Sequence, residues 1–156
     1  MKSLITAALI ASVSAAPVLA ADYSAGSTAK GWGLNGEEKA LFQAKVVDIL
    51  CEVAGDCADN CGDGRRQLGL LRADDDVLIY PNKNSQPAFS GAVEELLPFC
   101  GQDVEVDGLM ITEADLGAKN IFQVQKIRAT GDEEWTKACT WTKKWAKKHP
   151  EAKGKG

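Results

Sequence analysis

The sequence contains a single histidine, His149, which lies close to the C-terminus of a chain of 156 residues. Catalysis of the Ser-His or Cys-His type needs a histidine that a nucleophile can reach in the folded domain, so this class of hydrolase is not expected. Met110 is the only methionine besides Met1. A copper site built from histidine or methionine is therefore excluded as well.

Several short motifs that carry cofactor chemistry are also missing. No Cys-x-x-Cys pair occurs, which argues against a thioredoxin-like redox centre and against covalent haem. The segment 62–65 lacks the remaining glycines and the lysine of a phosphate-binding loop. The acidic loop 56–63 does not have the ligand order of a calcium-binding EF-hand. Carboxylates are plentiful, but none is singled out by an apolar setting, so we expect a non-enzyme without a cofactor.

Basic residues are scarce in the body of the chain. Residues 22–135 hold 10 Lys and Arg against 21 Asp and Glu, a net charge of −11, which argues against nucleic acid as a partner. Residues 136–156 hold 7 Lys and 1 Glu, a net charge of +6. We interpret this basic end as a solvated helix terminus and tail, and docking on an acidic partner or on anionic lipid is the alternative.

The N-terminus is typical of a secretory signal. Lys2 supplies the positive charge, an uncharged apolar stretch follows over 4–13, and small residues close the segment over 15–20. This order predicts cleavage near Ala20 and a periplasmic or secreted protein. An uncleaved anchor is the alternative, but the uncharged run is only marginally long for a bilayer and no stop-transfer charges follow. No membrane contact is expected apart from the basic tail.

The five cysteines are the most specific feature of the remaining chain. In an exported protein disulfides are the default, and an odd number leaves one thiol over. We expect two disulfides among Cys51, Cys57, Cys61 and Cys100, with Cys139 as the odd or buried thiol. Cys57 and Cys61 could close a small loop while Cys51 meets Cys100 near the core. The pairs Cys51–Cys57 or Cys61–Cys100 are alternatives. A metal site formed by the thiolates of Cys51, Cys57 and Cys61 is the functional alternative, although their spacing differs from that of structural zinc sites.

Hydrophobic periodicity predicts a series of short elements. They are a spacer over 22–36, a helix start over 37–44, a strand over 46–53, a hairpin of strands 67–71 and 77–80, a helix over 89–97, strands over 104–111 and 121–127, and a helix over 132–148. The segment 46–53 also fits a helical stripe, but its β-branched residues favour the strand. Gly108 predicts a bulge or a sharp bend in its strand. Thr130 and Glu133 have capping-box spacing for the last helix.

Five short strands with a helix between the third and fourth is the connectivity of the OB-fold barrel. By this element order, residues 44–129 resemble small secreted bacterial OB-fold proteins. The expected organisation is a signal peptide (1–20), a spacer or short helix (21–43), a mainly β OB-like barrel (44–129), a C-terminal helix (130–149) and a basic tail (150–156). The resemblance implies a partly open Greek-key barrel that binds its ligand on the second and third strands and the adjoining loops.

Three residues are candidates for ligand binding on such a barrel. Arg65 and Arg66 precede the second strand, where an arginine fork could hold a carboxylate or phosphate. A salt bridge from these arginines to Asp63 or to the acidic run 74–76 is the simpler interpretation. Tyr80 lies beside that acidic run. We therefore expect a periplasmic, non-enzymatic OB-like protein that binds a small ligand or a protein partner. A thiol-based accessory factor handling a metal or redox equivalents is the alternative.

Overall fold

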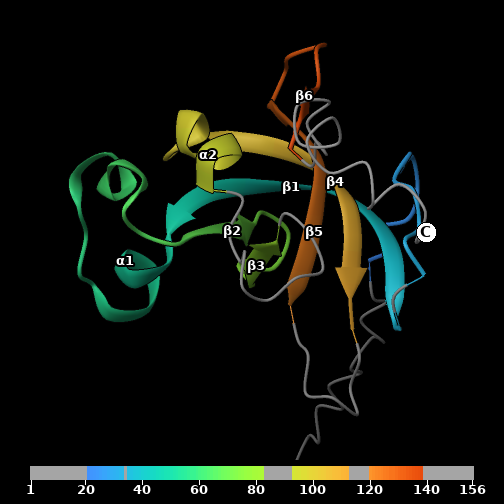
Figure 1. Ribbon diagram of the computed structural model, residues 1–156, viewed down its shortest axis with the longest axis horizontal. Helices are drawn as coiled ribbons and strands as arrows, with labels where there is room; N and C mark the ends of the chain where they lie inside the picture. Colours follow the sequence, from blue (N-terminus) through green and yellow to red (C-terminus); the bar gives the residue numbers. More distant parts are fainter. Residues whose placement is uncertain (1–20, 34, 83–92, 113–119, 139–156) are drawn as a thin grey trace, which may run out of the picture.

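The computed structural model describes residues 21–33, 35–82, 93–112 and 120–138 (Figure 1). Its strands are β1 (Glu37–Asp48), β2 (Leu68–Arg72), β3 (Leu78–Asn82), β4 (Asp103–Ile111), β5 (Ile121–Ala129) and β6 (Thr136–Lys137). Its helical elements are α1 (Ile49–Ala54), η1 (Asp59–Gly64), α2 (Val93–Leu96) and η3 (Leu97–Phe99). The described part of the chain is thus mainly β, as expected.

The first five strands form a closed barrel. Their order is β3-β2-β1-β4-β5, and a parallel pairing of β3 with β5 at Tyr80 and Ile121 closes the sheet on itself. The long strand β1 organises the barrel because it pairs with two neighbours. It is antiparallel to β4 over Glu37–Lys45 and antiparallel to β2 over Ala44–Asp48. The expectation of a five-stranded barrel is therefore confirmed.

The barrel interior follows from the two-residue period of its strands. On β1, Ala40, Phe42, Ala44 and Val46 are buried, and the polar or charged residues Gln43 and Lys45 between them are exposed. The rings of Phe42 and Phe122 meet at 4.8 Å between their centroids. The buried core also includes Leu68, Leu70, Ile79, Leu96, Val104, Val106, Val124 and Ile127. One contiguous apolar core therefore fills the barrel.

The bulge expected at Gly108 is confirmed. The register between β4 and β5 shifts between Asp107 and Gly108. A Cβ atom at Gly108 would lie 2.0 Å from the carbonyl oxygen of Gln123 and 2.8 Å from the ring of Phe122. Only glycine allows the two backbones to approach this closely, which is why a residue that weakens strands occupies the middle of a central one.

The first barrel strand begins earlier and ends earlier than the sequence predicts. The helix expected over 37–44 is wrong, because β1 already starts at Glu37. The strand expected over 46–53 ends at Asp48, whose carboxylate accepts a hydrogen bond from the backbone N–H of Leu50 and starts α1. Gly55 ends α1 in the left-handed region at φ 69°. Local capping therefore outweighs the β-branched residues that favoured a strand.

The C-terminal helix expected from residue 130 is wrong over 130–138. The chain turns at Gly131, whose φ of 97° is outside the helical range. Thr136 and Lys137 then form β6 against β5, and Ala138 donates a hydrogen bond to the carbonyl oxygen of Gln125. Hydrogen bonds to the unpaired edge of β5 replace those a helix would have made. The rest of the expected helix, the basic tail and Cys139 lie outside the described residues.

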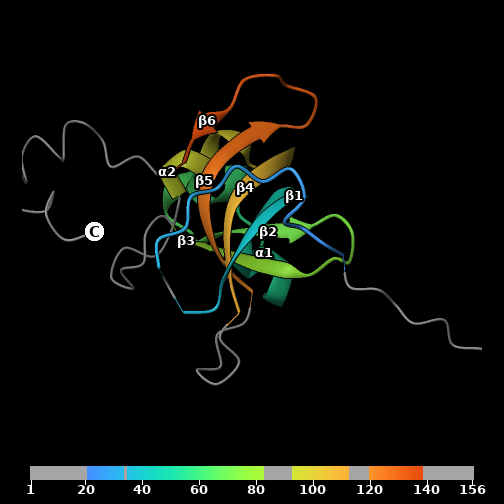
Figure 2. The ribbon, with the colours of Figure 1, turned by 90° about the vertical axis from the view of Figure 1, so that its right-hand side faces the viewer.

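The segment expected to be a spacer is packed on the barrel instead. Residues 22–30, which we call the N-terminal strap, cross the outer face of β4 and β5 (Figure 2). The buried carboxylate of Asp107 on β4 accepts hydrogen bonds from the hydroxyl groups of Ser27 and Thr28 and from the N–H of Thr28. Ala29 is buried as well. The strap is therefore part of the folded domain.

Candidate functional site

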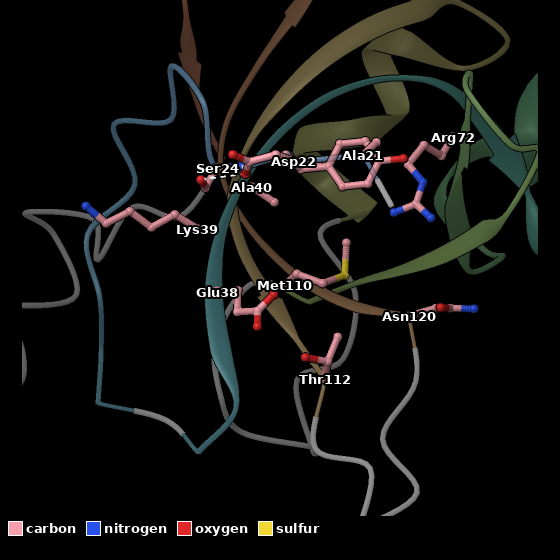
Figure 3. A pocket seen from close by; sticks show the side chains of 11 residues that line it. Ala21, Asp22, Ser24, Glu38, Lys39, Ala40, Arg72, Met110, Thr112 and Asn120 are labelled. Atoms are coloured by element: carbon pink, nitrogen blue, oxygen red, sulfur yellow. Dashed lines mark hydrogen bonds between the residues drawn. The ribbon is translucent and has the colours of Figure 1, made fainter. Parts of the chain in front are cut away.

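A cleft with a volume of about 630 Å³ opens at one end of the barrel. It lies where β1 and β5 begin and where β2 and β4 end, and the start of the N-terminal strap forms one side (Figure 3). Its walls are Ala21, Asp22, Tyr23, Ser24, Glu38, Lys39, Ala40, Arg72, Met110, Thr112 and Asn120. This volume is within the usual range for small-ligand sites.

Arg72 anchors one wall of the cleft. Its guanidinium lies 4.5 Å from the centre of the Tyr23 ring and 5.9 Å from that of Phe42. Asp75 holds the same group with two hydrogen bonds, 2.9 Å to Nε and 2.7 Å to the terminal nitrogen. A guanidinium fixed by a bidentate carboxylate and by an aromatic face is held in one orientation. This wall is therefore organised before any ligand arrives.

The cleft combines apolar and charged groups. Ala40 and the buried Met110 supply an apolar floor from β1 and β4. Around them, the side chains of Glu38, Thr112 and Asn120 stand at the rim of the cleft. The Lys39 side chain points away from the cleft in Figure 3, so its main chain is the part that lines the wall. Such a site suits a ligand that presents apolar and polar groups together.

The surroundings of Tyr23 change its acidity. Burial raises the pKa of the Tyr23 hydroxyl, the charge of Arg72 lowers it, and the charges of Asp75 and Asp74 raise it again, with a raised pKa as the net result. The hydrogen bond from Arg72 lowers the pKa of the Asp75 carboxyl. The pKa of Tyr23 therefore depends on the charge of Arg72 in this wall.

Removing the Arg72 charge should raise the pKa of Tyr23 further, because the attraction that favours the phenolate is lost while Asp74 and Asp75 remain. We expect this shift in an ultraviolet titration of Arg72→Met in a Tyr80→Phe background, where Tyr23 is the only tyrosine. Arg65→Met, an exposed arginine that does not line the cleft, is the matched control. A pKa that falls or stays constant in the Arg72 variant would contradict this account of the wall.

The three ligand-binding candidates from the sequence do not line this cleft. Arg65 is largely exposed and forms an ion pair with Asp63 at 3.7 Å, the simpler interpretation considered above. Arg66 bridges the buried carboxylate of Asp48 at 3.1 Å and Asp56 at 3.3 Å. Tyr80 is exposed on β3, and its N–H donates to the carbonyl oxygen of Asn120. Their role in ligand binding stays a prediction.

The cysteines pair as Cys51–Cys57 and Cys61–Cys100, the two combinations held as alternatives. The other arrangement left open by the sequence, with Cys57 bonded to Cys61 and Cys51 to Cys100, is wrong. Cys51 lies on α1 outside the barrel, while Cys61 is buried and reaches the chain after η3. These bonds engage all the thiols of the proposed metal cluster. Among the described residues, no group of three or more His, Cys, Asp or Glu is arranged to hold a metal ion.

Both disulfides brace a lobe that comprises residues 49–66 and projects from the barrel (Figure 1). Within it, the run from Asn60 to Asp63 has φ between 47° and 75°, so four consecutive residues are left-handed. Asn60 donates a hydrogen bond to the Asp63 carboxylate, and Arg66 packs against Gly62. On the outside of this lobe, Leu50 and Val53 are exposed. The cross-links hold a conformation that L-residues seldom adopt.

Comparison with models of known protein families, with characterised proteins and with solved structures finds no match to this chain. In the described part of the chain, no helix has the length and apolar character needed to cross a bilayer. The fold and the cleft therefore define the molecule on their own, as a disulfide-braced, closed five-stranded barrel with a mixed polar and apolar cleft at one end.

Proposed function

We propose that this chain is an exported, non-enzymatic OB-like protein that binds a small ligand or a segment of a protein partner in the cleft at the barrel end. The observation that carries the proposal is the cleft itself, with its apolar floor and with Arg72 fixed between Tyr23 and Asp75. A preformed site of this kind suits binding, because little has to be ordered when the ligand enters.

Strand order and chain order support the OB-like assignment. In the sheet, β1 lies between β2 and β4, β3 lies next to β2, and β5 lies next to β4. Strands β3 and β5 pair in parallel. The short helix α2 lies between β3 and β4 in the chain, as expected for an OB fold. The cleft lies at the end of the barrel and includes Arg72 from β2. It therefore adjoins the face that OB folds use for binding.

The two disulfides are consistent with an oxidising compartment, and the secretory signal supports the periplasm as that compartment. Cleavage after Ala20 would leave the new amino terminus at Ala21, which lines the cleft. Export would thus add a positive charge to the binding site. The acidic body, with its net charge of −11 over 22–135, supports a ligand other than nucleic acid.

Site-specific photo-crosslinking in the periplasm tests the proposal. A photoreactive phenylalanine derivative replaces Thr112 at the cleft in one variant, and Gln102 in the control. Both positions are exposed and flank β4, one at each end of the strand. We expect a discrete adduct at position 112 that position 102 does not give. Equal labelling at the two positions, or none at either, would contradict binding in the cleft.

A further inference from the structure

Strand β1 has an open edge position beside the cleft, at Lys39. Strand β4 pairs with β1 from Glu37 onward, whereas β2 joins β1 only from Ala44. In a strand, the N–H and C=O of alternate residues point to the same side. The N–H and C=O of Val46 form hydrogen bonds with the chain just before β4. The main-chain N–H and C=O groups of even-numbered residues therefore point towards β4, and those of odd-numbered residues point towards the opposite edge of β1. The N–H and C=O of Lys39 therefore face an edge that no strand of the described structure covers.

The N-terminal strap already uses this edge at one residue. The carbonyl oxygen of Tyr23 accepts a hydrogen bond from the N–H of Leu41 at 2.7 Å. Leu41 lies two residues beyond Lys39 and faces the same edge. On the far side, the N–H of Ala73 donates to the carbonyl oxygen of Gln43 at 2.9 Å. The edge thus binds main-chain groups of neighbouring segments, and Lys39 is the next position along it towards the cleft opening.

We propose that the cleft binds an extended peptide, a flexible segment of another exported polypeptide, as an added strand on β1 at Lys39. This inference rests on the proposed function and names the ligand class for the same site. Main-chain hydrogen bonds to an open edge give affinity, and pockets for alternate side chains give specificity. The cleft offers both, because the main chain of Lys39 and the apolar floor line the same wall.

The side chains on that wall specify the peptide. The side chains of even-numbered residues of β1 lie on the face of the strand that is turned to the barrel interior. This places Ala40 on the floor beside Met110 and Glu38 at the rim. A peptide residue opposite Ala40 meets an apolar surface, and one two residues away meets a carboxylate. The peptide therefore carries an apolar side chain and a basic one separated by a single residue. The net negative charge of the body also attracts a basic segment.

The test selects binders to the purified, oxidised mature chain from a random library of short linear peptides. We expect enrichment of the apolar-x-basic pattern. The best peptide is then synthesised with a single N-methyl group at each position in turn. Lys39 offers one carbonyl oxygen to one peptide N–H, so N-methylation should weaken binding by about tenfold or more at that single position and little at the residues on either side of it. An equal loss at every position, no loss at any position, or a library without binders overturns the proposal.

A matched pair of variants locates the peptide on the edge. Lys39→Pro removes the N–H that faces the cleft without removing a hydrogen bond to β4, and Lys39→Ala removes only the side chain. We expect about a tenfold or greater loss of affinity for the selected peptide in Lys39→Pro and a change of about twofold or less in Lys39→Ala. Equal affinities in both variants overturn the assignment to this edge. The N-methyl series on the unmodified protein decides the matter if Lys39→Pro fails to fold.

The outcomes separate this inference from the proposed function. A non-peptide adduct at position 112, together with a library that yields no binders, supports the cleft as a binding site and contradicts a peptide as its ligand. Selected peptides that no single N-methyl group weakens and that bind Lys39→Pro as tightly as the unmodified protein overturn strand addition.

Discussion

Replacing Cys61 and Cys100 together by alanine should lower the free energy of unfolding by about 4 kcal/mol, the largest effect we expect from any pair of substitutions here. The bond joins residues 39 apart in sequence, and it ties the left-handed run of η1 to the chain after η3. A cross-link over a long loop restricts the unfolded chain strongly. Urea unfolding of the oxidised proteins measures the difference.

The second disulfide provides the matched control for the first. Cys51 and Cys57 are only 6 residues apart, so removing both should cost about 2 kcal/mol by the same argument. Their loop includes the second part of α1 and lies outside the barrel, so the loss of this disulfide should leave the core intact. A loss for the 51–57 pair equal to or larger than that for the 61–100 pair would contradict the loop-length explanation.

Asp107→Asn should lower the free energy of unfolding by about 2–3 kcal/mol, because it removes the charge that holds the N-terminal strap. The buried carboxylate accepts hydrogen bonds at 2.6 Å from Ser27 and 2.7 Å from Thr28. Lys126 lies 3.7 Å away and also donates to the Thr28 hydroxyl. The neutral amide leaves Lys126 without its opposite charge. Asp103→Asn, an exposed position on the same strand, is the control and should change stability little.

The effect of Asp107→Asn should also depend on pH. Burial by itself raises the pKa of Asp107, but the hydrogen bonds from Ser27 and Thr28 and the charge of Lys126 together lower it. A carboxyl with a lowered folded pKa stabilises the fold fully above its unfolded pKa, about 3.9, and loses that contribution as pH falls through the folded value. The gap between the native protein and the variant should therefore persist from neutral pH down to about pH 4 and shrink below it. A gap that widens in acid would contradict this assignment.

The barrel strands could be predicted where burial follows a simple period. Leu68, Leu70 and Ile79 belong to short apolar runs beside the turn 74–76, which predicted the β2–β3 hairpin close to its true limits. Gly108 marked its bulge for the reason the structure shows, a backbone approach that excludes a side chain. The hairpin could be predicted because neighbouring residues decide it, and the bulge because glycine is the residue type that permits such a close approach.

Other elements depend on partners that are distant in sequence. The charged start of β1 at Glu37 and Glu38 has the composition of a helix, and its pairing with β4 decides for a strand. The capping signals after Thr130 likewise predict a helix that does not form over these residues, because Thr136 and Ala138 pair with the edge of β5. Local preference is a weak guide where a long-range ladder competes with it.

The cleft could not be predicted from the sequence, because it too depends on contacts between segments that are distant in the chain. Tyr23 lies in a segment rich in Ser, Gly and Ala that suggested a spacer, and its contact with Arg72 joins parts of the chain far apart in sequence. The only sequence signal was an aromatic residue isolated among small polar ones. The pairing of the cysteines could not be predicted either, because it depends on the position of α1 outside the barrel. The sequence predicted a strand over 46–53 instead.

The docked strap has a consequence for the order of events during biogenesis. Ser27 finds its carboxylate 80 residues later in the chain, and Gln125 accepts from the N–H of Lys30 at a separation of 95. Contacts so distant in sequence slow folding, because the intervening chain must be organised first. The segment that follows Ala20 therefore docks only after β4 and β5 have formed. On the proposed export, this segment is still undocked while the chain crosses the membrane, which leaves the site after Ala20 accessible to a signal peptidase.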